Sequence, residues 1–299
     1  MEIIPIDDHI TAIDHELLGV HGCGVSYLVR GDSIALIETG TSLTVDKTLA
    51  GLAALGIARE AVDHIICTHV HMDHAGGAGY LATALPKASV YLHSTTIPFL
   101  VEPSRLMASV RRAVGEVAWP LHGDCLPIAV ERMRPAEDLR LDLGRDVLLE
   151  AMATPGHSPD HLSFWDRKSG GLFIGDAAGL HMPRLGVSLP VTPPPTYSLS
   201  DHQATIAMLR SQPISRIYLT HCGAYANVAE RLATADEQLA ALVALIDMAL
   251  DRGESDVLAL ARRWLPFEDN LPGSLIAHCW SEMSVAGMLR YEQRHRQQG

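Results

Sequence analysis

The sequence lacks an excess of basic residues, any long apolar run and any pair of cysteines at C-x-x-C spacing. Its 23 Lys and Arg against 35 Asp and Glu give a formal charge of −12 at pH 7, whereas nucleic-acid phosphates and anionic membrane surfaces call for a basic protein. No stretch approaches the roughly 18 consecutive apolar residues of a membrane-spanning helix. We therefore expect neither a nucleic-acid partner nor a membrane partner.

The N-terminal segment and the cysteines exclude two further classes. The first residues, MEIIPIDDHI, have neither the basic start nor the long apolar stretch of a signal peptide, so we expect a cytoplasmic protein. The cysteines are odd in number and widely scattered, which predicts reduced, mainly buried thiols and no disulfide framework. They are Cys23, Cys67, Cys125, Cys222 and Cys279.

The apolar pattern predicts two β-rich halves, each accompanied by helices. Strand-like runs lie at 9–14, 24–30, 33–38, 64–67, 88–93, 139–143, 146–154, 161–166 and 171–176. Helical spacing occurs at 44–55, at 77–85 and over 97–119, where Pro103 interrupts it. The first three strands predict an antiparallel meander. Together the elements predict an α+β fold of two sheets packed face to face, with helices outside.

The last third of the chain changes character. Five prolines between residues 182 and 200 predict an extended loop, because proline fits neither a regular helix nor a central strand. A helix at 201–212 and a strand at 214–221 follow, and after Ala224 the pattern is helical, with breaks near Gly253 and at 265–274. We therefore divide the chain into a catalytic domain, 1–223, and a C-terminal helical region, 224–299.

Residues 69–74 read His-Val-His-Met-Asp-His and follow an expected strand. Three imidazoles and a carboxylate within six positions are too many buried polar groups for a packing role, so they predict a transition-metal site. His69 and His71 share one face of an extended segment, while Asp73 and His74 follow as the chain turns into a helix. One short loop can therefore supply two ligands to each of two ions.

Three further ligand candidates each follow an expected strand: His157, Asp176 and His221. Strand ends that meet at one rim are a common way to assemble a site from distant parts of a chain. Other histidines are expected to line or flank the site without binding metal. These are His93, His161, His181 and His202.

The motifs THVHMDHAGG, TPGHSPDH, GDAAG and THCG, in this order, resemble those of the metallo-β-lactamase-fold hydrolases over roughly residues 10–223. The resemblance implies a four-layer αβ/βα sandwich with a C-terminal helical appendage, an overall plan similar to glyoxalase II and the alkylquinolone-signal biosynthesis thioesterase. It implies two divalent transition-metal ions, zinc first, with iron or manganese as alternatives. One ion would be held by His69, His71 and His157, the other by Asp73, His74 and His221, with Asp176 bridging both. The sequence departs from the common pattern at Glu38, where most relatives carry an aspartate that supports the metal loop.

The resemblance also narrows the chemistry. It implies a hydrolase that uses a metal-bridging hydroxide to cleave a small ester-like substrate, a thioester or a lactone, with Asp73 as the hypothetical catalytic proton acceptor. Secreted β-lactamases of the fold lack the bridging Asp176, and its iron flavoproteins replace His71 by Glu, so antibiotic hydrolysis and a redox role are disfavoured. The lactonase tyrosine, three positions after the bridging aspartate, is Gly179 here, and Tyr197 is another candidate for that place.

Two other functions stay open. The first is hydrolysis of a phosphodiester or phosphotriester, and the second is a metal-containing regulatory protein that acts through a partner. For the hydrolase we expect a small-molecule substrate, with the proline-rich loop 183–200 and the C-terminal helices as its wall. The helical segment 97–119 is a candidate pocket wall or homodimer surface.

Overall fold

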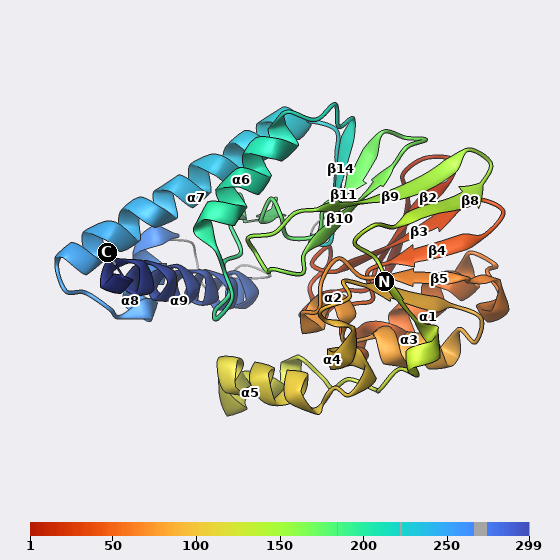
Figure 1. Cartoon of the computed structure of the whole chain (residues 1–299), viewed down its shortest axis with the longest axis horizontal. Coiled ribbons are helices and arrows are strands. Elements are labelled where there is room, and N and C mark those ends of the chain that lie inside the picture. Colours follow the sequence, from red (N-terminus) through yellow and green to blue (C-terminus); the bar gives the residue numbers. More distant parts are fainter. Residues whose placement is uncertain (184, 222, 266–273, 299) are drawn as a thin grey trace.

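The computed structural model describes residues 1–183, 185–221, 223–265 and 274–298, and two β-sheets packed face to face form one side of it, at the right of Figure 1. Within these residues the first sheet has seven strands, ordered β1 to β7 as in the chain. They are β1 (Glu2–Pro5), β2 (Ile10–Asp14), β3 (Val25–Arg30), β4 (Ile34–Ile37), β5 (His64–Ile66), β6 (Ser89–Leu92) and β7 (Met133–Pro135). Strands β2 to β4 form the predicted antiparallel meander, β1 pairs antiparallel with β2, and β4 to β7 pair in parallel.

The second sheet has the order β15-β14-β11-β10-β9-β8. Its strands are β8 (Arg140–Gly144), β9 (Val147–Ala153), β10 (Leu162–Asp166), β11 (Gly171–Phe173), β14 (Arg216–Leu219) and β15 (Gly223–Tyr225). Only β11 and β14 pair in parallel among these described strands. Because helix α6 (Leu199–Arg210) lies between β11 and β14 in the chain, it supplies the crossover that a parallel pair requires.

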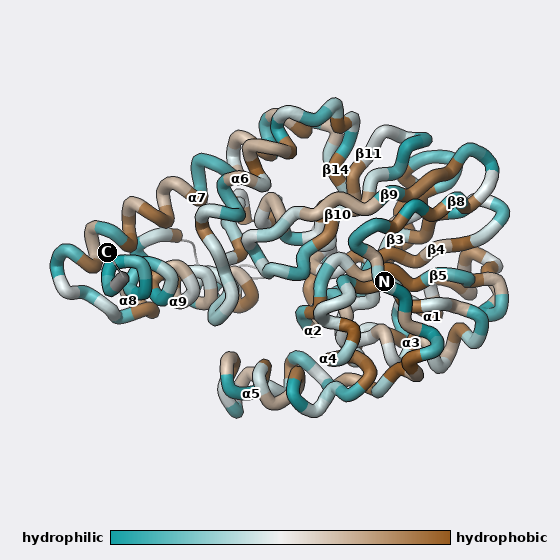
Figure 2. Tube along the Cα trace, in the orientation of Figure 1, coloured by the Kyte–Doolittle hydropathy of each residue, from teal (hydrophilic) through white to brown (hydrophobic). Residues whose placement is uncertain are grey.

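The apolar core lies in layers, as Figure 2 shows by the brown segments in the sheets. One cluster lies between the sheets and joins side chains such as Tyr27, Ile37, Phe164 and Phe173. A second lies between the first sheet and its helices, and a third between the second sheet and α6 and α7. The covering helices are α1 (Val45–Ala54), α3 (Ala78–Ala84) and α7 (Val228–Asp251). The predicted four-layer sandwich is therefore confirmed.

Two strands of the first sheet were not expected from the sequence. Strand β1 is largely exposed and lacks an alternating apolar face, and β7 is three residues long and ends at Pro135. Both lie at the edges of the first sheet, where exposed or proline-containing strands are tolerated. Pro103 separates α4 (Ile97–Val101) from α5 (Ser104–Ala118), as predicted, and α5 projects from the body in Figure 1.

The C-terminal helices α7, α8 (Val257–Trp264) and α9 (Ser274–Gln298) pack around their own apolar cluster beside the sandwich (Figure 1). The predicted break near Gly253 is present, and most of the one at 265–274 lies outside the described residues. Strand β15 spans residue 224, the limit between the two predicted domains, and the first helix of the appendage begins at Val228. The division into two domains stays a prediction.

The proline-rich segment is extended, with one addition. A hairpin pairs β12 (Leu180–Met182) with β13 (Val187–Leu189), so a short strand lies inside the region predicted as loop. Apolar side chains of this hairpin pack in a cluster with side chains of α9. This packing stabilises the two strands although the segment around them is rich in proline. Cys23, Cys67 and Cys125 are buried, Cys279 is exposed, and Cys222 lies outside the described residues. No helix in the described part of the chain is both long and apolar enough to cross a membrane.

Candidate metal centre

The histidine-rich loop follows β5 and changes conformation in its middle. Residues 68–71 form bends, and His71, whose φ of −60° and ψ of 151° are extended, is the residue before helix α2 (Met72–Ala75). His69 and His71 therefore lie on the segment that precedes the helix, whereas Asp73 and His74 lie on its first turn. This change of direction sends the two pairs of side chains to two neighbouring places, as the spacing in the sequence predicts.

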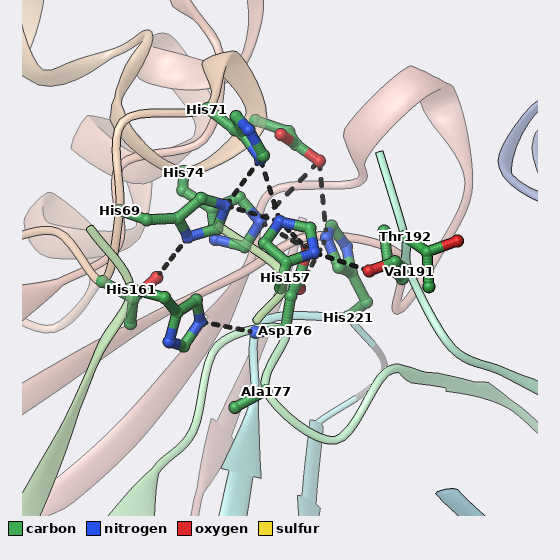
Figure 3. Close-up of polar contacts among 12 residues, drawn as sticks. His69, His71, His74, His157, His161, Asp176, Ala177, Val191, Thr192 and His221 are labelled. Atoms are coloured by element: carbon green, nitrogen blue, oxygen red, sulfur yellow. Dashed lines mark hydrogen bonds and ion pairs between the residues drawn. The ribbon is translucent and has the colours of Figure 1, made fainter. Parts of the chain in front are cut away.

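The first cluster consists of His69, His71 and His157 (Figure 3). His157 Nε2 lies 3.1 Å from His69 Nε2 and 2.9 Å from His71 Nδ1, and the last two atoms lie 2.9 Å apart. Three nitrogens bound to one tetrahedral zinc ion, at about 2.0–2.1 Å, would lie about 3.3 Å from one another. The three rings thus converge at nearly the spacing that a single ion requires.

The second cluster consists of Asp73, His74 and His221. Asp73 Oδ2 lies 3.4 Å from His221 Nε2 and 3.8 Å from His74 Nε2. The three residues come from the helical turn of the loop and from the end of β14. Two imidazole nitrogens and a carboxylate oxygen form a second donor set suited to a transition metal.

Asp176 lies between the two clusters, after β11. Its Oδ2 is 3.4 Å from His157 Nε2 and 3.4 Å from His74 Nε2, and its Oδ1 is 3.6 Å from His221 Nε2. One carboxylate therefore faces a ring of the first cluster and two rings of the second. The structure brings together all seven predicted ligands, and their role in holding metal stays a prediction.

Hydrogen bonds behind the rings decide which nitrogen faces the site. His157 Nδ1 donates to the backbone oxygen of Val191 at 2.8 Å, and His221 Nδ1 donates to that of Cys23 at 2.6 Å. Because a carbonyl can only accept, each Nδ1 carries the hydrogen and each Nε2 presents its lone pair to the cluster. This is the tautomer that metal ligation through Nε2 requires.

Glu38, the departure from the usual pattern, holds the second cluster from behind. Its carboxylate is buried, with Oε2 2.9 Å from His74 Nδ1, and its Oε1 accepts the N–H of Thr68 at 3.2 Å. Glu38 has a φ of 69°, an uncommon backbone conformation for a residue with a side chain. The longer side chain thus reaches both the ligand His74 and the strand end that leads to His69.

The flanking histidines separate into two groups. His161 lies beside the first cluster, where its Nε2 accepts the backbone N–H of Asp176 at 3.1 Å (Figure 3), and His202 Nε2 donates to Ala177 O at 3.1 Å. His181 instead bonds Ser188 across the β12–β13 hairpin. His93 lies 2.8 Å from the Thr95 hydroxyl, outside the clusters.

Burial and mutual charge keep the first cluster in the form that binds metal. Burial lowers the pKa of His69 well below its usual value, helped by the neighbouring imidazoles, and lowers the pKa of His157 to about 3. Burial alone would raise the pKa of Asp176, but His74, His157 and His221 outweigh it and hold the pKa well below its usual range. Neutral imidazoles beside an ionised carboxylate are the protonation states that a cation needs.

The second cluster attracts positive charge. Burial lowers the pKa of His74, but the carboxylates of Asp176, Glu38 and Asp73 outweigh it and raise the pKa well above its usual value. Buried within this group, His74 Nε2 and Asp176 Oδ1 have no hydrogen-bond partner among the described residues. Both atoms are buried without a partner in the described part of the chain, in a region where carboxylates favour positive charge. A divalent metal ion bound there would give each atom the partner that it lacks.

The site opens at one side and is walled at another. Asp73 has a side chain 23% exposed, and His71 is partly exposed, whereas the other predicted ligands are buried. Trp280 of α9 lies against His221, with ring centroids 4.7 Å apart, and belongs to the apolar cluster of the β12–β13 hairpin. Tyr197, the alternative lactonase tyrosine, is buried and its hydroxyl lies 3.3 Å from His202 Nδ1.

Sequence reasoning missed the backbone acceptors and the aromatic wall. The oxygens of Cys23 and Val191 carry no side-chain pattern, so no motif could reveal them. Trp280 lies 59 residues after His221 in a helix of ordinary composition, and only the packing of α9 brings the two rings together.

Comparison with known families matches residues 22–221 to the model of the metallo-beta-lactamase superfamily. A probable metallo-hydrolase of Bacillus subtilis is 26% identical over 194 residues, which are 61% of this chain and 77% of that protein. An uncharacterized protein of the same species is 30% identical, over 48% of this chain and 60% of its own length. A putative diflavin flavoprotein of Nostoc is 28% identical over 52% of this chain. The matched segment is only 23% of that flavoprotein's length.

Solved structures share the fold over nearly the whole chain. An archaeal metallo-beta-lactamase superfamily protein from Sulfolobus tokodaii has a TM-score of 0.71 at 18% identity, covering 95% of this chain and 98% of that one. A metallo-beta-lactamase family protein from Thermus thermophilus has a TM-score of 0.64 at 22% identity, covering 98% and 92%. At these identities the likeness concerns the fold alone.

Proposed function

The chain belongs to the metallo-beta-lactamase superfamily, whose members are mostly metal-dependent hydrolases, and we propose that it hydrolyses a small ester-like substrate, a thioester or a lactone, with two bound metal ions. The observation that carries the proposal is the pair of ligand clusters that share Asp176. A single-ion site would need no second set of donors on the far side of this carboxylate. Two sets favour a dinuclear hydrolase.

The residues have separable tasks. His69, His71 and His157 would hold one ion, Asp73, His74 and His221 the other, and Asp176 would touch both. Divalent transition-metal ions held by these residues would supply Lewis acidity, which would activate a water molecule near neutral pH and polarise a carbonyl oxygen. The backbone oxygens of Cys23 and Val191 keep two of the rings in the ligand tautomer before any ion arrives.

Asp73 is the ligand best placed to move a proton. Hydrolysis of a thioester forms a C–O bond from water and breaks the C–S bond, and the water's proton must reach the departing sulfur. Asp73 is partly exposed, so its carboxylate lies at the open side where a substrate enters. His74 and His221 hold its pKa below the usual value despite burial, so the carboxylate is ionised and able to accept.

An apolar wall favours an acyl substrate over a phosphate ester. Trp280 lies over His221, and the cluster around it includes Met182, Met283 and Val191, whose backbone oxygen holds His157. Apolar side chains at the metal centre would bind the hydrocarbon part of an acyl group. A phosphodiester would instead gain from arginine or lysine side chains.

The test combines metal analysis with a substrate panel. We expect purified protein to bind about two metal ions per chain and to hydrolyse thioesters or lactones faster than aryl phosphates. His69→Ala should abolish turnover, whereas His93→Ala, which removes a histidine outside the clusters, should leave it unchanged. The proposal would be refuted if the purified protein contained no transition metal and showed no activity when zinc, manganese or iron is added.

The same panel addresses the two alternatives. Preferential turnover of aryl phosphates would identify the phosphoesterase. No turnover, combined with capture of a partner by wild type and His69→Ala alike, would identify the regulatory protein.

A further inference from the structure

His15, directly after β2, is a buried histidine whose ring has no hydrogen-bond partner. The side chain is fully buried, and neither Nδ1 nor Nε2 has a partner among the described residues. Its backbone N–H is paired, donating to Gly24 O at 2.9 Å. Because buried polar atoms nearly always have partners, an imidazole in this place calls for a use of its nitrogens that a phenyl ring would not serve.

Two glycines make room for the ring. A Cβ on Gly24 would lie 2.3 Å from His15 Cε1 and 2.8 Å from Nδ1, and a Cβ on Gly40 would lie 2.8 Å from Cε1 and 2.9 Å from Nε2. Contacts this short do not occur between real side-chain atoms, so any other residue at either position would displace the ring. The ring therefore lies tightly between two backbone segments.

These two segments are the ones that orient the histidines of the second cluster. Gly24 follows Cys23, whose oxygen accepts from His221 Nδ1 at 2.6 Å. Gly40 follows Thr39, whose N–H and hydroxyl donate to His74 O at 2.9 and 2.7 Å. The ring of His15 thus touches both backbone supports of the second cluster, and neither support belongs to the first cluster.

The protonation state of the His15 ring leaves both of its nitrogens able to hydrogen-bond to water. Burial lowers the pKa of His15 to about 3, so at neutral pH one nitrogen donates and the other accepts. The hydroxyls of Thr41 and Thr48, in the segment that follows Gly40, are also buried and unpaired among the described residues. Buried polar atoms without a protein partner are characteristic of sites for ordered water.

We propose that His15 is a positioning residue for the second cluster: through ordered water bound to its ring nitrogens, it braces the backbone at Cys23–Gly24 and Thr39–Gly40 and thereby fixes His221 and His74. The inference rests on the two ligand clusters of the proposed function and is independent of the substrate. It assigns His15 no contact with substrate.

His15→Phe keeps a ring of similar size and removes both nitrogens. Zinc is titrated into metal-free protein in competition with a chelator, and cobalt, which absorbs visible light when bound, reports each site's geometry. Loss of an outer partner of a metal ligand typically costs 10–100-fold in affinity. We expect the second equivalent to bind about 10–100-fold more weakly and its cobalt spectrum to change, with the first equivalent as in wild type.

Two more substitutions separate hydrogen bonding from space filling. His15→Asn or His15→Gln, which places an amide near Nδ1 or Nε2 respectively, should restore part of the lost affinity that His15→Phe does not. Gly24→Ala keeps the nitrogens and pushes the ring, so it should also weaken the second equivalent selectively; it remains informative if His15→Phe does not fold.

Three results would overturn the inference: wild-type affinity for both equivalents in His15→Phe, equal weakening of both, or no rescue by either amide. Failure of the proposed function looks different, because wild type itself would then bind fewer than two ions.

Discussion

Replacing Glu38 by Gln changes one atom in a carboxylate that faces two donors. Glu38 Oε2 accepts from His74 Nδ1 at 2.9 Å, and Oε1 accepts the Thr68 N–H at 3.2 Å. Both carboxylate oxygens are therefore used as acceptors, in a site with almost no exposure to water. An amide offers only one acceptor oxygen, so in Glu38→Gln one of the two donors must face an NH₂ group.

Either orientation of the new amide damages the second cluster. If the NH₂ faces His74, the ring must move its hydrogen to Nε2 to avoid opposed donors, and the lone pair that faces Asp73 and Asp176 is lost. If the NH₂ faces Thr68, a buried backbone N–H loses its acceptor next to His69. We expect the second metal equivalent to bind about 10–100-fold more weakly, or about 1.4–2.8 kcal/mol.

Glu38→Asp is the matched control, because it keeps two acceptor oxygens and shortens the side chain by one methylene. We expect it to weaken the second equivalent less than Glu38→Gln does. Affinities for both equivalents are measured by chelator competition, and thermal unfolding checks that each variant folds. Two zinc ions bound to Glu38→Gln with wild-type affinity, or a larger loss in Glu38→Asp, would refute the reasoning.

Three other perturbations test the surroundings of the site. Trp280→Ala should raise KM about tenfold for thioesters with apolar acyl groups and leave short ones nearly unchanged, whereas Trp280→Phe should stay within about threefold; equal effects on all chain lengths would contradict an apolar wall. Gly175→Ala places a Cβ 2.6 Å from His161 Nε2 at a φ of +50°, so urea unfolding should show a loss of about 1–3 kcal/mol, and an unchanged midpoint would argue against this contact. Burial lowers the pKa of His9, but its bonds to carboxylates, including Asp166 at 2.7 Å, outweigh it and raise the pKa. The hydrogen bonds of His9 therefore stabilise the fold fully below about pH 6.5, the pKa of histidine in the unfolded chain, and stabilise it less as pH rises through the folded pKa. In urea titrations, His9→Asn should therefore lower the free energy of unfolding more at low pH than at high pH. A cost independent of pH would exclude this coupling.

Much of the fold follows from patterns that act over short distances. The strands 10–14, 25–30 and 34–37 alternate or concentrate apolar residues, and Pro103 separates two helices wherever the rest of the chain lies. The edge strands β1 and β7 escaped prediction, because their pairing depends on a neighbouring strand and not on their own composition. The short strand β13 likewise depends on its partner β12 and on the helix that packs against the hairpin.

The sequence by itself predicted which imidazoles and carboxylates of the histidine-rich loop are candidate donors, and their division between two directions. His69 and His71 precede helix α2 while Asp73 and His74 lie on its first turn, so local backbone geometry separates the two pairs. Only the tertiary structure decided that Asp176 lies between the clusters, that Val191 and Cys23 offer their oxygens to His157 and His221, and that Trp280 covers one ring. These contacts join residues far apart in the chain, many through backbone atoms that every residue carries. Their existence therefore depends on how the sheets and helices pack, which no local motif encodes.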